Sequence, residues 1–490
     1  MNHKGIDFNI LLIFGNFALL ILTLYTYLLN GSNKYVDHYS IFLFAILAIE
    51  NILILWYELK NRDPFLITLQ LTTLIFFLGR IPTLIIFEEN TILSYLTVTP
   101  SNINYSLIFI ICSNFMIFLG LIFADAKKPN ILDTRIKDLV VQPIILFILY
   151  IFVLIISFPE TLFKIPIPSL ITGYLQNFVF NYQSYLLIII VFLVLYSKKL
   201  SYENYMFGAV ILFYIMIHGF SGGRGTGFEH TFSFLFFTIL SFNRVIYFRL
   251  KHIVILLVLI PLVYFSISFG YFNRLNNIHS QQKTGFDSYV SKYKDYKNSP
   301  FYSNTSVILP FIFSRIGSFD HTIRLISHGE DYLNTVNPLY NFQSVIDNVF
   351  TPGMDFFDKP YANHTLKFID NGIDEPGMYL ANQKGYHSTT LTIYGETYVW
   401  FKSLGLIGIL GSLLALFIFG YVFKSAYYSI NNSNPFLMQL YQVAIIYLFY
   451  VRINTFGFDW DIRLFLRILL PIMIFSYFFV KDKEVVPSNG

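Results

Sequence analysis

The chain has 490 residues, of which 55% are hydrophobic and only 13% are charged, and its formal net charge is +4. Soluble globular proteins carry about 25% charged residues, so this composition excludes a typical water-soluble enzyme. The small net charge and the lack of a basic tail with interleaved aromatic residues argue against a nucleic-acid-binding protein. A single cysteine, Cys112, leaves no intrachain disulfide and no CxxC metal site.

Apolar runs recur along the chain, and each is roughly 17–25 residues long, which is enough to cross a hydrocarbon core of about 30 Å. Such continuous runs predict helices, because a membrane β-barrel alternates apolar and polar residues in short segments. We therefore expect an all-α polytopic integral membrane protein with about 12 transmembrane helices. The expected spans are 8–29, 40–58, 64–88, 104–124, 140–158, 182–197, 204–220, 228–243, 252–272, 398–423, 435–451 and 461–480.

The Lys and Arg content of the loops alternates between rich and poor along these spans. Short loops rich in Lys and Arg face the cytoplasm. The poor set includes EENTILSYLTVTPSNIN, which has no Lys or Arg, and the loop at 159–181, which has only Lys164. The rich set comprises Lys60 and Arg62, Lys127, Lys128, Arg135 and Lys137, Lys198 and Lys199, Arg244, Arg249 and Lys251, Lys424, and Lys481 and Lys483. We expect a multi-pass protein of the inner (cytoplasmic) membrane with both termini in the cytoplasm.

One long polar segment, residues 273–397, interrupts the apolar pattern on the expected outer face. Loops longer than about 15 residues usually carry function or are disordered. The aromatic content of this segment and its apolar piece at 307–327 predict an ordered subdomain that rests on the membrane. The expected organisation is a bundle of nine spans at 1–272, an outer loop subdomain at 273–397, and three spans with a cytoplasmic tail at 398–490.

The stretch GFSGGRGTGFEHTF, residues 219–232, places five glycines around Arg224 on the same outer face. It lacks the GK[ST] ending of a nucleotide-binding Walker A loop. A glycine-rich backbone can approach an anion closely, and arginine offers a bidentate fork to a phosphate or carboxylate. Two interpretations stay open: a phosphate or diphosphate clamp, and a tight turn whose arginine contacts lipid headgroups.

Arg80, in FFLGRIPTLIIF, lies inside an expected span. Sixteen residues at about 1.5 Å each put it some 24 Å from the cytoplasmic start, in the outer third of the bilayer. Charged side chains at such depth tend to face a polar cavity. We favour an anion-binding role over the alternative, an arginine that snorkels to the headgroups.

Further arginines are expected near the same surface. Asp320 and Arg324 have the i, i+4 spacing of a helical ion pair, whereas Arg315 has no acidic residue three or four positions away. Between the last two spans, Asp459 can pair with Arg463, which leaves the roles of Arg452 and Arg467 less accounted for. Cations from separate parts of the chain are therefore expected to share one side of the membrane.

An acid–base group is expected where the polar segment meets the span at 398–423. His387 and Glu396 lie in YHSTTLTIYGETYVWFKSLGLIGILG, and either could accept a proton from a sugar hydroxyl. An ion pair with Lys402 or a nearby arginine would explain the presence of Glu396 equally well. The histidines of residues 273–397 show no HExxH or HxH spacing, so no bound metal is expected.

The number of spans, the long outer loop, the GGRG that follows a span and the TIYGETYVWFKSLGLIGILG that leads into a late one resemble the O-antigen polymerases of the Wzy type. This resemblance implies polymerisation of undecaprenyl-diphosphate-linked oligosaccharide repeat units at the outer face, by inverting glycosyl transfer, for O-antigen in lipopolysaccharide or a related surface polysaccharide. It implies no cofactor, nucleotide sugar or metal. The implied partners are the lipid-linked oligosaccharides, membrane lipid and a chain-length regulator protein.

The resemblance also suggests roles for the candidate residues. Diphosphate binding falls best on Arg224 and Arg315. The further candidates for that role are Arg80, Arg452 and Arg467, and those for the catalytic base are Glu396 and His387.

Two neighbouring functions stay open. O-antigen ligases, which transfer the chain to the lipid A core, carry an essential outer-loop histidine that YHSTTL could imitate. A lipid-linked oligosaccharide flippase would need charges through the depth of the membrane and two similar halves, whereas this chain concentrates its charge at the outer surface and shows no evident repeat.

We predict that Arg224→Ala abolishes chain extension and that Arg224→Lys restores it only in part, because lysine lacks the bidentate fork. The measurement is the length distribution of the surface polysaccharide on a gel. Wild-type chain lengths in the alanine variant, at normal expression, would rule out the clamp.

Overall fold

A computed structural model describes six main segments of the chain: 6–86, 98–124, 318–327, 393–402, 404–429 and 435–454. It also describes short pieces at 236–237, 240, 247–248, 261, 264–265, 268–269, 272, 293–299 and 302. These residues are almost entirely helical. The exception is a pair of two-residue strands, β1 (Ile6–Asp7) and β2 (Tyr247–Phe248), which run antiparallel to each other.

Within the described residues, five helices are long and apolar enough to cross a membrane. They are α1 (Phe8–Asn30), α2 (His38–Asn61), a continuous helix made of α3 (Pro64–Thr72), η1 (Thr73–Leu78) and α4 (Arg80–Ile86), α5 (Pro100–Phe123), and α21 (Gly405–Ser429). A sixth helix, α22 (Pro435–Asn454), contains a shorter apolar stretch. The all-α membrane class is thus confirmed, while the total of twelve spans stays a prediction, because the other expected spans lie wholly or mostly outside the described residues.

Short polar residues set where these helices begin. Side chains of Asp7, Asp63 and Thr99 accept hydrogen bonds from the first-turn backbone of α1, α3 and α5, and proline occupies the first turn of α3 and α5. Both features are standard signals for a helix N-terminus. The helices α1, α2, α3 and α5 start within four residues of the predicted spans.

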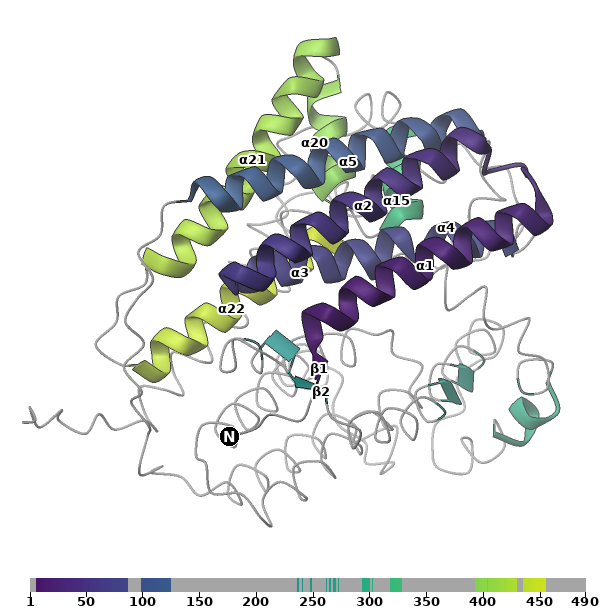
Figure 1. Cartoon of the computed structure of the whole chain (residues 1–490), viewed down its shortest axis with the longest axis horizontal. Coiled ribbons are helices and arrows are strands. Elements are labelled where there is room, and N and C mark those ends of the chain that lie inside the picture. The colour runs from purple at the N-terminus through teal and green to yellow at the C-terminus, as the bar shows by residue number, and fades with distance from the viewer. Residues whose placement is uncertain are drawn as a thin grey trace, which may run out of the picture.

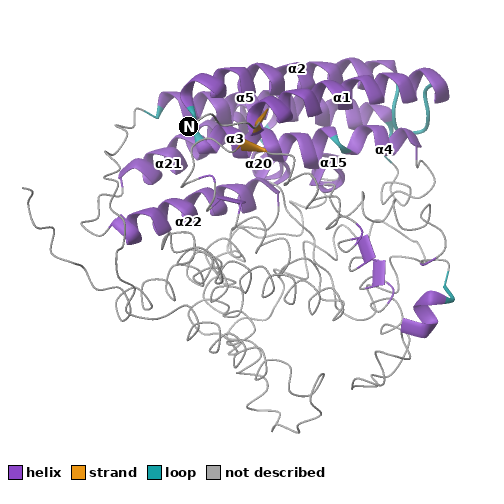
Figure 2. Cartoon of the chain, turned by 60° about the horizontal axis from the view of Figure 1, so that its bottom comes forward, coloured by secondary structure: helices purple, strands orange, loops and turns teal. Residues whose placement is uncertain are grey.

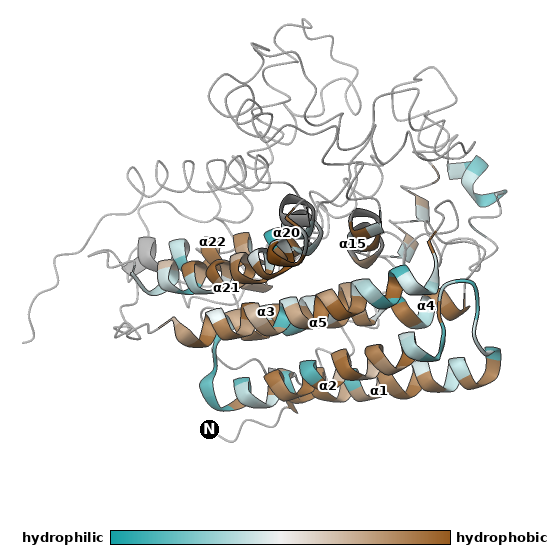
Figure 3. Ribbon diagram, turned by 90° about the horizontal axis from the view of Figure 1, so that it is seen from above, coloured by the Kyte–Doolittle hydropathy of each residue, from teal (hydrophilic) through white to brown (hydrophobic). Residues whose placement is uncertain are grey.

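The helices are arranged in layers (Figures 1 and 2). Viewed from above, α1 and α2 form one layer, α3 and α5 lie behind them, and α21 and α22 lie on the far side (Figure 3). Two shorter helices, α15 (Ser318–Ser327) and α20 (Ile393–Lys402), also lie on that side. Apolar residues cover most of the long helices, as a lipid-embedded bundle requires.

One end of the bundle is joined by polar contacts around Asp37, which caps α2. The amide of Asn104 on α5 donates to both carboxylate oxygens of Asp37 at 3.1 Å, and Ser40 donates to Asn104 at 2.6 Å. Burial raises the pKa of Asp37, but the hydrogen bonds from Ser40 and Asn104 outweigh burial and hold this pKa below its ordinary value. The negative charge is therefore retained where α2 meets α5.

The opposite end carries ion pairs. Lys424 near the end of α21 contacts Asp63 at 2.7 Å, and Arg62 contacts Asp7 at 2.7 Å. The loop-charge pattern assigned Arg62 and Lys424 to one side of the membrane, and the structure brings both to one end of the bundle. That this end faces the cytoplasm stays a prediction.

Two glycines let α5 and α21 cross in close contact. A Cβ atom on Gly420 would lie 2.5 Å from the carbonyl oxygen of Ile117, and one on Gly120 would collide with the carbonyl oxygen of Phe417 and lie 2.9 Å from the backbone nitrogen of Tyr421. Small residues at such crossings are typical of membrane helices, which gain stability from close packing rather than from the hydrophobic effect. This crossing fixes a late helix of the chain against an early one.

The expected span at 398–423 is divided in the structure. α20 ends at Lys402, and α21 begins at Gly405 in the left-handed conformation (φ 62°). Lys402 and Ser403 are polar, but apolar residues flank this pair on both sides, so hydropathy alone did not show the break. Glycine at 405 is the residue that permits it.

Part of the polar segment 273–397 packs among the bundle helices. On α15 the side chains of Phe319, Thr322, Ile323 and Ile326 are buried, at the i, i+3, i+4, i+7 spacing of one helix face. The apolar piece at 307–327 was expected to be ordered and to rest on the membrane, and its described portion lies against α5, η1 and α20. Most of the rest of that expected subdomain lies outside the described residues.

We predict that Gly120→Ala destabilises the protein by about 1–3 kcal/mol, because the added methyl group forces α5 and α21 apart. Gly15→Ala is the matched control, since its Cβ would make an ordinary 3.6 Å contact with a Leu74 methyl group. The measurement is denaturant-induced unfolding in detergent micelles. Equal stability of the two variants would contradict the close crossing.

Candidate functional site at an aromatic junction

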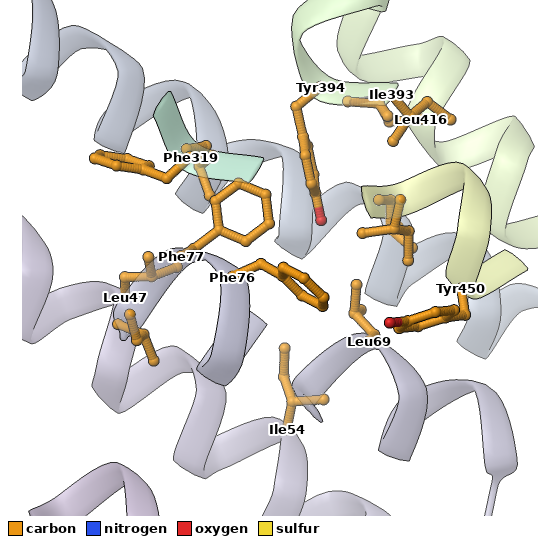
Figure 4. Packing of buried hydrophobic residues seen from close by; sticks show 14 of the residues in the cluster. Leu47, Ile54, Leu69, Phe76, Phe77, Phe319, Ile393, Tyr394, Leu416 and Tyr450 are labelled. Atoms are coloured by element: carbon orange, nitrogen blue, oxygen red, sulfur yellow. The ribbon is translucent and has the colours of Figure 1, made fainter. Parts of the chain in front are cut away.

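Five buried aromatic rings meet inside the bundle and form what we call the aromatic junction: Phe76, Phe77, Phe319, Tyr394 and Tyr450 (Figure 4). The ring centroids of Phe77 and Tyr394 are 5.2 Å apart, those of Phe77 and Phe319 are 6.4 Å apart, and those of Phe76 and Tyr450 are 6.2 Å apart. The rings come from η1, α15, α20 and α22. Residues far apart in the sequence therefore share one packed centre.

The geometry of the junction is specific. The Phe77 ring is nearly perpendicular to both Tyr394 (89°) and Phe319 (85°), which is the edge-to-face arrangement that aromatic quadrupoles favour. Such pairs contribute about 0.5–1.5 kcal/mol each beyond the apolar area that they bury. Phe77 thus holds α15 and α20 in place against the membrane helix η1.

A chain of buried hydrogen bonds runs beside the junction. The Tyr394 hydroxyl donates to Oδ1 of Asn114 on α5 at 2.6 Å, the Asn114 amide donates to Oγ1 of Thr73 at 3.2 Å, and the Thr73 hydroxyl donates to the Leu69 carbonyl oxygen at 2.8 Å. Polar side chains inside a membrane bundle are stabilised by such interhelical bonds. This chain fastens α20 to α5 and to the start of η1.

The π-helical turn η1 sets the position of Arg80. The backbone nitrogen of Gly79 donates to the carbonyl oxygen of Leu74, five residues back, at 2.9 Å. A Cβ at position 79 would lie 2.9 Å from the Ile75 carbonyl oxygen, so the turn requires glycine. Single π-turns occur frequently at functional sites, because they shift the following side chains around the helix axis.

Arg80 itself is buried, with 2% of the residue exposed. Its Nη1 donates to Oγ1 of Thr83 at 2.7 Å, and that hydroxyl donates to the Arg80 carbonyl oxygen at 2.6 Å. The guanidinium group therefore lies inside the protein and not along the lipid-facing surface. A buried cation at this depth is expensive to maintain, which marks it as a functional candidate.

Two more predicted site residues lie on helices that reach the junction. Arg452 is in the last turn of α22, half-buried and two residues beyond Tyr450. The backbone of Glu396 is on α20, two residues beyond Tyr394. The other predicted site residues, His387, Arg224, Arg315 and Arg467, lie outside the described residues.

The residues that make the junction were not singled out from the sequence. Asn114 and Thr73 carried a signal, since both are polar residues within apolar spans. The tyrosine at 394 carried none, because tyrosine is abundant throughout this chain. Its importance comes from its partner 280 positions earlier.

No protein-family model, curated protein or solved structure matches this chain. Among the residues that the structure describes, no group of three or more His, Cys, Asp or Glu side chains could hold a metal ion.

We predict that Tyr394→Phe destabilises the protein by about 0.6–1.7 kcal/mol, because Asn114 loses its buried donor. A double-mutant cycle with Asn114→Leu should give a coupling energy of about the same size. Tyr57→Phe is the control, since 40% of Tyr57 is exposed. Additive effects of the two changes, measured by unfolding in micelles, would show that this hydrogen bond does not hold α20.

Proposed function

We propose that this protein is an O-antigen polymerase of the Wzy type, which joins undecaprenyl-diphosphate-linked oligosaccharide repeat units at the outer face of the inner membrane. The observation that carries the proposal is the burial of Arg80 directly after the π-turn η1, whose Phe76 and Phe77 contact α22, which carries Arg452, and α20, which carries Glu396. A membrane enzyme that acts on a lipid diphosphate needs cations inside a bundle that is open to lipid. The apolar helices and this buried arginine meet that need.

In the proposed reaction the anomeric carbon of the growing chain breaks its bond to the lipid diphosphate and forms a bond to a hydroxyl oxygen of the incoming unit. Glu396 or His387 takes the proton of that hydroxyl. Arg80, Arg224, Arg315, Arg452 and Arg467 are the candidates that stabilise the negative charge developing on the departing diphosphate. Inversion at the anomeric carbon follows from a single displacement.

In this scheme the lipid tails bring the two reactants close together. Both reactants are anchored in the same leaflet, so tails that enter between the helices bring the two diphosphates to one site without a diffusional search through solvent. A chain-length regulator protein is the proposed protein partner, and no cofactor is required. The proposed cell location is the inner membrane with both termini in the cytoplasm.

A lipid-linked oligosaccharide flippase is the second candidate. The observation that favours it is Glu50, an acidic residue near the middle of α2, because transporters use ionisable groups within the membrane. Ligation of the chain to the lipid A core is the third, and it differs from polymerisation only in the acceptor.

Deletion of the gene separates the polymerase from the other two candidates. Loss of a polymerase leaves single repeat units on the cell surface. Complete absence of the surface sugar would favour the flippase or the ligase.

We predict that Arg80→Ala lowers the rate of chain extension by about 10²–10³-fold, as expected for loss of one preorganised donor to a developing oxyanion. Arg80→Lys should recover part of it, and Thr83→Val should have a smaller effect, because Thr83 only positions the guanidinium group. The measurement is in vitro polymerisation with purified protein and lipid-linked repeat units.

Arg62→Ala serves as the control, since Arg62 pairs with Asp7 at the other end of the bundle. The proposal fails if Arg80→Ala, expressed and folded normally, extends chains at the wild-type rate. Equal losses in the Arg80 and Arg62 variants would point to a general effect of removing charge.

A further inference from the structure

Glu50 is an acidic residue placed at mid-membrane depth. It lies twelve residues after His38 and eleven before Asn61, so at about 1.5 Å per residue it is roughly 16–18 Å from either end of α2. Acidic side chains at that depth are rare, and when present they are usually functional. The polymerase reaction proposed above, at the outer face, assigns no role to this group.

The carboxyl group of Glu50 points into the bundle. Both of its oxygens are buried, and within the described part of the chain neither has a hydrogen-bond partner. On the same helix, Leu47, Asn51 and Ile54 are buried while Ile49 and Leu53 are exposed. Glu50 thus lies at the edge between the packed and the lipid-facing sides of α2, with its polar end turned inward.

Among the helices that the structure describes, those that pack on α2 offer no counter-ion. The helices α1, α3, η1 and α5 contain no Asp, Glu, His, Lys or Arg. Two titratable groups interact electrostatically with Glu50, namely the thiol of Cys112 on α5 and the hydroxyl of Tyr394 on α20. Both are neutral and weakly acidic, so neither can balance a carboxylate charge.

The surroundings are polar but not charged. Next to Glu50, the Asn51 amide donates to Oδ1 of Asn16 at 2.8 Å and to the Gln70 carbonyl oxygen at 3.3 Å. On α5, the buried hydroxyl of Ser113 has no hydrogen-bond partner within the described residues. Amides and hydroxyls of this kind can accept a hydrogen bond from a carboxylic acid or donate one to a carboxylate.

We propose that Glu50 is a proton-binding site in the middle of the membrane, where its carboxyl group is held as the neutral acid and exchanges its proton during the working cycle of the protein. A buried carboxylate without a cation partner is strongly disfavoured inside a membrane bundle, whereas the neutral acid is tolerated. Proton exchange here converts a neutral acid to a carboxylate with one negative charge. The proton passes to or from water.

The exchange would act on α20 through Tyr394. With Glu50 neutral, the Tyr394 hydroxyl donates to Asn114. An ionised Glu50 competes for that hydroxyl, because a hydrogen bond to a charged acceptor is the stronger one. Loss of the proton would therefore loosen the contact that holds α20 against α5.

The test uses a hydrophobic carbodiimide, which reaches carboxyl groups from the lipid phase and reacts with the protonated form. Purified full-length protein in lipid nanodiscs is treated at several pH values, and modification is located by peptide mass spectrometry. We expect modification at Glu50, with a yield that falls at least several-fold as the pH is raised, and none in Glu50→Gln. Because glutamine mimics the neutral acid, Glu50→Gln should fold with wild-type stability.

Cys112 is the control for access, since it is exposed, interacts with Glu50 and is the single cysteine of the chain. If a hydrophobic maleimide labels Cys112 while the carbodiimide leaves Glu50 unmodified, Glu50 is ionised and the proposal is wrong. If neither reagent reacts, the infrared spectra of the wild-type protein and Glu50→Gln are compared at the carbonyl stretch of a protonated carboxylic acid. Loss of this band in Glu50→Gln supports the proposed site, and identical spectra overturn the proposal.

Discussion

The hydrogen bond from Tyr394 to Asn114 is the contact on which the interior of this protein depends. It joins positions 280 residues apart and lies in surroundings where an unpaired polar group is costly. Because Asn114 also donates to Thr73, the same bond fixes α20 against both α5 and the π-turn η1. The edge-to-face packing of Phe77 against Tyr394 and Phe319 then follows from the position of α20.

Much of the described fold could be predicted from the sequence, since hydropathy marks the spans and Asp, Thr and Pro mark their starts. The spans predicted at 8–29 and 64–88 are observed at Phe8–Asn30 and Pro64–Ile86. The break between α20 and α21 was missed, because it depends on the conformation of Gly405 and not on composition. The π-turn was missed because it depends on the local backbone conformation at Gly79. The packing of α15 against α5, η1 and α20 was missed because it depends on contacts between distant segments.

In the candidate site, too, some residues could be recognised from the sequence and others only from the structure. A buried cation within a span could be recognised at Arg80 from its depth alone, and its burial is now observed. The choice of Glu396 and Arg452 rested on local sequence, and the structure adds that their helices contact the π-turn before Arg80 through Tyr394 and Tyr450. Glu50 drew no attention in the sequence because one acidic residue in an apolar run gives no hint of its partners. That its described neighbours α1, α3, η1 and α5 offer no counter-ion became visible only in the structure.

The central claim is that part of the long polar segment enters the bundle and reaches the membrane helix that carries Arg80. It is tested most directly by disulfide or short bifunctional cross-linking of Phe77→Cys with Phe319→Cys in a Cys112→Ser background. A matched pair, Phe123→Cys with Phe417→Cys, joins α5 and α21 at a similar ring separation of 6.0 Å. Both pairs should cross-link in native membranes with comparable yield. Cross-linking of the control pair alone would contradict the placement of α15 and, with it, the aromatic junction.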